Sequence, residues 1–146
     1  MTVSLRSIGR DNWRTCISLK PSDDQARFIA PNVVSLAQAK ACPECVPLAI
    51  YAGERMVGFL MYEPDYDAEG WYSLHRFMMA AEHQRQGYGR AAMRELVKRL
   101  REEGTFKQVL LSYIPENRSA EAFWPRMGFQ PTGEVQGREI VMRLDL

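Results

Sequence analysis

The sequence predicts an α+β protein in which helices cover a mixed sheet, and three patterns lead to this class. A glycine-containing turn at residues 52–54 joins two apolar strands, which is a hairpin signal. A strand, an amphipathic helix and a second strand follow over residues 71–114. A further helix then leads to two strands joined across Gly137. Antiparallel hairpins combined with one strand–helix–strand unit give a mixed sheet rather than a purely parallel one.

In the first half of the chain, residues 2–8 alternate between apolar and polar side chains and predict the first strand. Asp11 can cap a helix that runs to about Lys20, and Pro21 ends it. The other elements predicted in this half are a helix over 24–30, a short helix over 36–41 capped by Ser35, and strands over 47–51 and 55–62.

In the second half, a loop over 63–70 carries four carboxylates, and the central strand over 71–79 follows it. Ala91, Leu96, Val97 and Leu100 recur at helical spacing, which predicts that one face of the next helix is buried. The loop acids are Glu63, Asp65, Asp67 and Glu69. The remaining predicted elements are a helix over 87–103 ended by Gly104, a strand over 106–114, a helix from Asn117 to about Met127 closed by Gly128, and strands over 131–135 and 139–144.

The composition favours one ordinary globular domain over residues 1–146. The chain has 46% hydrophobic residues, and 19 basic against 18 acidic residues leave a formal net charge of +1. This balance indicates neither a nucleic-acid partner nor a membrane-surface partner. The N-terminal residues lack the apolar core of a signal peptide, and no apolar run is long enough to span a membrane. We therefore expect a cytoplasmic protein.

Three cysteines are an odd number, which argues against a disulfide framework. Cys42 and Cys45 form a C-x-x-C pair, but a zinc site would need two more ligands. The two histidines, His75 and His83, lie far along the chain. We therefore expect no metal.

The most informative segment joins the central strand to the helix that begins near residue 87. Gly87-Tyr88-Gly89 opens this helix, so several backbone N–H groups lack helical partners and converge on one point. The positive end of the helix dipole favours an anion there, and Gln84, Arg85 and Arg90 add donors that suit a pyrophosphate. An ordinary strand-to-helix connection is the alternative, but the preceding strand, the helix and the basic flank favour the anion site.

Two segments resemble motifs of the GNAT family of N-acetyltransferases, in the order and at the separation typical of that family. They are Gln84-x-x-Gly87-x-Gly89 and Asn117-x-x-Ala120-x-x-Phe123-Trp124-x-x-x-Gly128-Phe129. The likeness covers about residues 45–146. Arg76-Phe77 and the N-terminal part resemble bacterial polyamine (spermine/spermidine) acetyltransferases more weakly. The resemblance implies the GNAT fold, a mostly antiparallel sheet of about six to seven strands that splays at its central strands.

The resemblance also implies acetyl-CoA as cosubstrate. Its pantetheine would lie along Phe77, Met78 and Met79, with the Met79 N–H as the donor to the thioester oxygen. Asn117 would bind the pantetheine side, although it is equally suited to capping a helix. The residues expected at the pyrophosphate are Gln84, Arg85, Gln86, Gly87, Tyr88, Gly89 and Arg90.

Acetyl transfer to an amine requires a neutral nucleophile, whereas most primary amines are protonated at neutral pH. His75 on the central strand matches a base-bearing position of related polyamine enzymes and is the candidate general base. Trp124 occupies the place of the family tyrosine that protonates the CoA thiolate. An indole N–H can donate to the sulfur but is not a usable acid. Tyr113 or water could replace it.

The acceptor is expected to be a small primary amine, with spermidine and spermine as candidates, attacked directly in a ternary complex. Because a polyamine is a flexible cation, carboxylates and aromatic faces suit it. The substrate-binding candidates are Asp24, Gln25, Glu63, Tyr66 and Arg76, the last being a cation that weighs against a polyamine unless an acid pairs with it. A protein or peptide amine as acceptor, and a non-catalytic acyl-CoA-binding module, are the alternatives. Strand edges near the C-terminus favour a homodimer.

Overall fold

The computed structural model describes residues 2–67 and 70–146 and confirms the α+β class. Seven strands form one sheet in the order β1-β2-β3-β4-β5-β7-β6, and only β4 and β5 pair in parallel. The elements are β1 (Val3–Ser7), α1 (Trp13–Ser18), α2 (Asp23–Ala26), α3 (Asn32–Ala41), β2 (Val46–Ala52), β3 (Arg55–Asp65), β4 (Trp71–Met79), a short 3-10 helix (Ala81–His83), α4 (Tyr88–Glu103), β5 (Gln108–Tyr113), α5 (Arg118–Arg126), β6 (Gln130–Gln136) and β7 (Glu139–Asp145).

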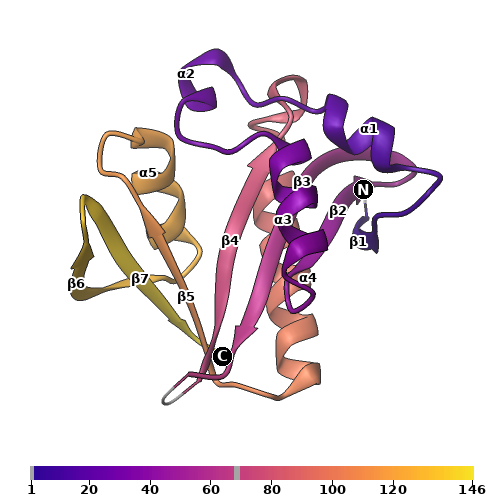
Figure 1. Ribbon diagram of the computed structural model, residues 1–146. Helices are drawn as coiled ribbons and strands as arrows, with labels where there is room; N and C mark the ends of the chain where they lie inside the picture. The colour runs from indigo at the N-terminus through magenta and orange to yellow at the C-terminus, as the bar shows by residue number, and fades with distance from the viewer. Residues whose placement is uncertain (1, 68–69) are drawn as a thin grey trace.

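Helices cover both faces of this sheet, with α3 and α4 on opposite sides (Figure 1). The larger core lies under α4 and α5, where Leu96 and Leu100 are fully buried and Ala91 and Val97 pack at its margin, as the helical spacing predicts. The smaller core lies under α1 and α3 and is built around Phe59. In the described part of the chain, none of the helices combines the length and apolar character that a membrane crossing requires.

Several helix and loop boundaries near the N-terminus differ from the sequence prediction. α3 begins at Asn32 after Pro31, so Ser35 lies inside the helix and is buried instead of capping it. The first helix follows Asn12 rather than Asp11, because the Asn12 side chain organises the preceding turn by accepting from the Gly9 N–H at 2.8 Å. α1 and α2 are also shorter than expected.

The predicted loop over 63–70 is in part a strand. β3 continues to Asp65, so Glu63 and Asp65 belong to the sheet, where pairing with β4 fixes their direction. Glu69, the fourth acid of that predicted loop, lies outside the described residues.

Two irregularities of β4 shape the centre of the molecule. Met61 pairs with Arg76 and Tyr62 with Leu74, so His75 is an extra residue in a β-bulge. On the other side, β4 pairs with β5 only at Tyr72–Val109 and Ser73–Leu110. Beyond these pairs the two strands diverge, as Figure 1 shows, and the splayed sheet expected from the family resemblance is confirmed.

Candidate functional site

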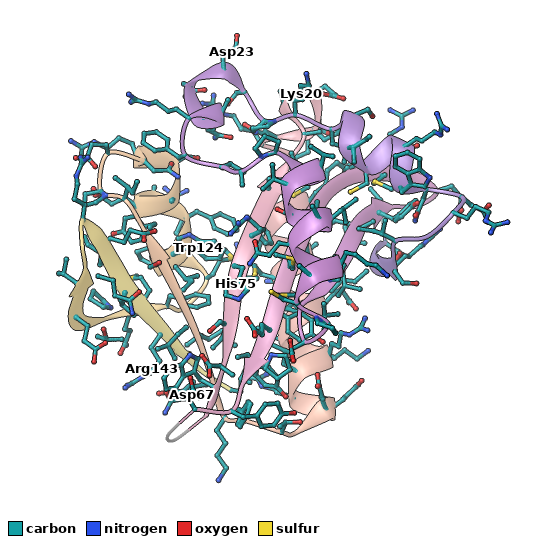
Figure 2. All side chains as sticks on the ribbon, in the orientation of Figure 1. Lys20, Asp23, Asp67, His75, Trp124 and Arg143 are labelled. Carbon is teal, nitrogen blue, oxygen red and sulfur yellow. The ribbon has the colours of Figure 1, made fainter. Side chains whose placement is uncertain are left out.

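A cavity of about 330 Å³ opens where β4 and β5 diverge. His75 lines it from β4, Tyr113 from β5 and Trp124 from α5. Figure 2 shows the His75 and Trp124 side chains in the middle of the sheet, at this divergence. The chain after α2 closes the top through Phe28, and Glu139 contributes a carboxylate from β7. The splay thus brings segments from across the whole sequence around one space.

His75 is paired with Glu63 of the neighbouring strand. The His75 Nε2 and Glu63 Oε1 atoms are 2.7 Å apart, and each side chain is about 30% exposed. An ionised carboxylate only accepts hydrogen bonds, so a neutral His75 donates from Nε2 and keeps Nδ1 as its basic nitrogen. The bulge leaves both His75 and Arg76 on the same side of the sheet as Glu63, whereas a regular alternation would place Arg76 on the opposite face. This carboxylate–imidazole pair is suited to accept a proton.

Arg76 holds this bulge in place. Its guanidinium donates to the backbone oxygen of His75 at 2.9 Å, to Ser35 Oγ at 3.1 Å and to Gln38 Oε1 at 3.0 Å. All three acceptors are neutral, and two of them belong to α3. Arg76 lines the cavity and its donors serve the connection between β4 and α3, but within the described residues no acid neutralises its positive charge.

On the side of β4 that faces β5, every second residue directs its backbone N–H group toward the gap between the two strands. The Ala80 N–H donates to the Val57 oxygen at 2.9 Å, so by antiparallel alternation the Met78–Phe59 pair is hydrogen-bonded. Phe77 and Met79 lie in the intervening pairs, and their N–H groups therefore point away from β3, toward the divergence. Contrary to the expectation, Met78 directs no backbone N–H group toward β5. Its backbone pairs with β3, and its side chain is buried under α3.

The turn before α4 has the geometry of an anion site. Gly87 precedes the helix with φ of 83°, and no side chain of the described residues caps the first turn, formed by Tyr88, Gly89 and Arg90. Arg85 is also in the left-handed region, with φ of 61°. Within the described residues, neither Arg85 nor Arg90 has a carboxylate partner. The backbone N–H groups of this turn are thus uncapped, and two exposed cations, Arg85 and Arg90, are close to them in the chain.

The two glutamines of this turn, Gln84 and Gln86, donate hydrogen bonds to other groups of the protein. Gln84 Nε2 donates to the Met79 oxygen at 3.0 Å and to Gln25 Oε1 at 2.8 Å, and Gln25 in turn donates to Ser119 Oγ at 3.1 Å. Gln86 donates to the Glu82 oxygen at 3.2 Å. Gln84 therefore positions the turn and joins α2 to α5 through Gln25, instead of directing its amide nitrogen at a phosphate.

α5 contributes an aromatic wall. Trp124 is 8% exposed, and its ring packs edge-on against Phe77 at a centroid distance of 5.4 Å. Asn117 caps the helix by accepting from the Ala120 N–H at 3.2 Å, as its sequence position predicts, and it also lines the cavity. Burial raises the pKa of the Tyr113 phenol, with a smaller contribution from the charge of Glu121. Tyr113 is therefore a weaker acid than an exposed tyrosine.

Among the predicted acceptor residues, the fold groups only some. Glu63 joins His75, but Tyr66 is 71% exposed and packs against Phe106 at a centroid distance of 5.1 Å. In Figure 2, Asp67, which is next to Tyr66 in the chain, and Asp23, which belongs to α2, lie at opposite ends of the molecule. Tyr66 is thus remote from the cavity, because β3 carries it to the far end of the sheet, and Asp24 is exposed on α2 without lining the cavity.

Phe28 and Glu139 are among the cavity residues that were not predicted from the sequence. Phe28 follows a short helix and Glu139 begins a hairpin strand, and neither position carries a motif. Glu139 accepts one hydrogen bond, from Ser112 Oγ at 3.3 Å. Only the packing of β7 beside β5 brings its carboxylate to the divergence, so no local signal could have identified it.

Comparisons with known proteins agree with this geometry. A family model described as the Acetyltransferase (GNAT) family matches residues 5–129. The chain is 29% identical to a spermine/spermidine N(1)-acetyltransferase of Bacillus subtilis (strain 168), over 98% of this chain and 99% of the relative.

Two solved structures share the fold. They are a spermidine N-acetyltransferase from Vibrio cholerae in complex with CoA and spermine, and the ribosomal-protein-S18-alanine N-acetyltransferase from Escherichia coli. The first has a TM-score of 0.75 at 17% identity and covers 99% of this chain and 95% of its own. The second has a TM-score of 0.73 at 19% identity and covers 99% and 94%. Proteins with such different acceptors share this architecture, so the fold alone does not identify the acceptor.

Proposed function

Because the family model spans most of the chain, this protein belongs to the GNAT family of acetyltransferases, and we propose that it acetylates a primary amine of a polyamine. Acetyl-CoA is the cosubstrate of this N-acetyltransferase. The observation that carries the proposal is the His75–Glu63 pair at the edge of a cavity that also contains the Glu139 carboxylate. The pair supplies a base for the amine, and the second carboxylate suits an acceptor with more than one positive charge.

In the proposed complex, the pyrophosphate of acetyl-CoA lies at the N-terminus of α4, against the backbone N–H groups of Tyr88, Gly89 and Arg90. The exposed Arg85 and Arg90 side chains balance its charge. The pantetheine then follows the splayed edge of β4, where Phe77 and Met79 direct N–H groups toward it. We assign the Met79 N–H to the thioester oxygen, where an oriented donor stabilises the developing negative charge by about 3 kcal/mol.

The reaction is a direct attack. His75 takes a proton from the substrate ammonium, through water or directly, and the neutral amine nitrogen attacks the thioester carbonyl carbon. The nitrogen of the tetrahedral intermediate loses its extra proton to water, collapse of the intermediate breaks the C–S bond, and the amide and the CoA thiolate are released. Glu63 keeps the imidazole oriented and stabilises the imidazolium that forms. No covalent acyl-enzyme is needed, because the described cysteines do not line the cavity.

The departure of CoA is the step at which this sequence differs from the family pattern, because Trp124 stands in place of the family tyrosine. Trp124 lines the cavity at the position of the family tyrosine, and its indole N–H can donate to the leaving sulfur. A thiol has a pKa of about 8.5 in water, so a thiolate leaves readily and takes its proton from solvent afterwards.

We therefore expect Trp124→Tyr to change kcat by no more than about threefold, which is small beside the effect of a general acid that limits the rate. Steady-state kinetics with saturating acetyl-CoA measure this, and Trp124→Phe serves as the matched control without a polar group. A tenfold or larger gain in the tyrosine variant, absent in the phenylalanine variant, would show that protonation of the thiolate limits turnover.

The polyamine assignment draws on the relative from Bacillus subtilis and on the charge of the cavity. Glu139 is half-buried, and its contact with Ser112 leaves acceptor capacity for an ammonium group. Phe28 and Trp124 add aromatic faces, which attract cations. We propose that one amine of the acceptor meets His75 while a second ammonium lies at Glu139. The cytoplasm, where acetyl-CoA is available, is the proposed location, and a homodimer through the exposed edge strand β6 remains a prediction.

An acceptor panel tests this function. With acetyl-CoA and a thiol-detecting reagent, spermidine and spermine are expected to be acetylated faster than a monoamine of similar length or an N-terminal peptide. Glu139→Gln should raise KM for spermidine about fivefold, since an ion pair of this exposure contributes about 1 kcal/mol, and leave KM for acetyl-CoA unchanged. Glu134→Gln, on the exposed strand β6, is the control. Turnover confined to the peptide would refute the polyamine assignment.

A further inference from the structure

Three potential metal ligands of different chemistry converge beside the cavity. Cys45 Sγ, a carboxylate oxygen of Glu63 and a ring nitrogen of His75 all lie within 4.8 Å of one another. They come from the chain before β2, from β3 and from the bulge of β4, and they share the face of the sheet covered by α3. We propose that Cys45, Glu63 and His75 bind a divalent transition-metal ion of the zinc class, and that this ion inhibits acetyl transfer.

The distances suit such an ion after small side-chain movements. Glu63 Oε1 is 2.7 Å from His75 Nε2 and 3.8 Å from Cys45 Sγ. Tetrahedral zinc, with bonds of about 2.0–2.3 Å, places its ligand atoms about 3.3–3.6 Å apart. The cluster therefore needs shifts of about 1 Å, which small χ rotations of the three side chains provide without moving the strands.

The ligand set selects the class of ion. One sulfur, one imidazole nitrogen and one carboxylate oxygen are donors for zinc and its neighbours in the transition series, whereas magnesium and calcium prefer oxygen alone. A thiolate and a carboxylate together neutralise the charge of a divalent ion, so the occupied cluster carries no net charge into a half-buried place. His75 also lines the cavity, so the fourth coordination position of the metal ion would be open to water from the cavity.

The surrounding charges leave this cluster available. Arg76, the neighbouring cation, directs its donors to Ser35, Gln38 and the His75 backbone, and it makes no ion pair with Glu63. In the part of the chain that the structure describes, His75 is the single ion-pair partner of Glu63. Cys45 is 5% exposed and is not in a disulfide. An ion that enters from the cavity therefore replaces the hydrogen bonds of the cluster and releases the proton of the Cys45 thiol to solvent.

Inhibition follows from the identity of one ligand and rests on the proposed function. An imidazole that coordinates a metal through Nε2 no longer donates to Glu63, and its other nitrogen becomes a poorer base. Acetyl transfer itself requires no metal, so the ion acts as a regulator of the enzyme and not as its cofactor. Zinc should thus lower kcat, and a chelator should restore it.

Cobalt(II) provides a direct test that requires no catalytic activity. Metal-free full-length protein is titrated with Co²⁺ while the near-ultraviolet sulfur-to-cobalt charge-transfer absorption is recorded. We expect saturation at one equivalent and loss of the absorption on addition of Zn²⁺. Cys45→Ser should abolish the absorption, and Cys42→Ser, which alters an exposed cysteine in the same turn, should retain it.

The outcomes separate the site from the function. Wild-type protein without the absorption, or a Cys45→Ser variant that keeps it, overturns the metal site. If Cys45→Ser fails to fold, Glu63→Gln replaces it and should weaken Co²⁺ binding at least about tenfold. Binding without inhibition of polyamine acetylation overturns the regulatory role alone. Binding by a protein that acetylates no amine leaves the site intact and contradicts the proposed function instead.

Discussion

Replacing His75 by alanine is expected to lower kcat by about 10²-fold or more at neutral pH, with KM for acetyl-CoA changed less than about twofold. The substrate amine is then mostly protonated, and no other imidazole lines the cavity to take its proton. KM for acetyl-CoA should change little because His75 lies away from the turn proposed to bind the pyrophosphate. Steady-state kinetics with spermidine measure both constants.

Glu63→Gln is the companion variant. Glutamine has the same shape and can still hydrogen-bond to the imidazole, but it cannot stabilise the imidazolium that forms during proton transfer. We expect an intermediate loss, about tenfold in kcat. An acetyl-CoA thermal-shift response equal to that of the wild type confirms that each variant is folded. A decrease of less than twofold in the kcat of His75→Ala would show that His75 is not the base and that water deprotonates the amine.

The second large effect concerns the turn before α4. Gly87→Val should weaken acetyl-CoA binding at least about tenfold, since 1.4 kcal/mol corresponds to that factor. Gly87 has φ of 83°, where a β-branched side chain is strained by about 1–2 kcal/mol or more, so the turn must adjust. A Cβ at Gly87 meets no atom within 4 Å, which means that the space in front of it is open to a ligand that valine would displace. Isothermal titration with acetyl-CoA measures the change.

Gly53→Val is the matched control for this experiment. Gly53 also has a positive φ, 61°, and also lacks any atom within 4 Å of an added Cβ, but it lies in the hairpin between β2 and β3. The two variants should therefore lose similar stability by thermal denaturation, while only Gly87→Val loses affinity. Equal affinity of both for acetyl-CoA would show that the pyrophosphate does not approach the backbone at Gly87.

Local patterns predict the sheet and the long helix well. The alternation of β1, the apolar runs of β3 and β4 and the helical spacing of α4 each depend on neighbours a few residues apart. Boundaries were predicted less well where two local signals compete. Ser35 can cap a helix, but Pro31 already ends the extended chain four residues earlier, and packing against β4 then buries Ser35 under Arg76.

The same distinction between local and long-range signals applies to the residues of the candidate site. Gly87 precedes α4 and Asn117 caps α5, as their sequence positions predict, because a helix start needs only the residues next to it. The backbone direction of Met79 and the loss of Met78 from the edge depend on the register between β3 and β4. A shift of one residue would exchange the two, and no sequence window contains that register.

By itself, the sequence determined that this chain is an acetyl-CoA-dependent transferase and predicted a phosphate-binding turn, because the motif that indicates both lies in one contiguous strand–turn–helix segment. The tertiary structure decided which carboxylate pairs with His75, placed Tyr66 away from the cavity, added Glu139 to the cavity and brought Cys45 close to His75. Glu63, Cys45 and Glu139 are 12, 30 and 64 positions from His75 in the sequence, and Tyr66, 9 positions away, lies at the far end of the sheet. Strand pairing, the bulge and the splay set their distances, and those are properties of the folded chain rather than of any local pattern.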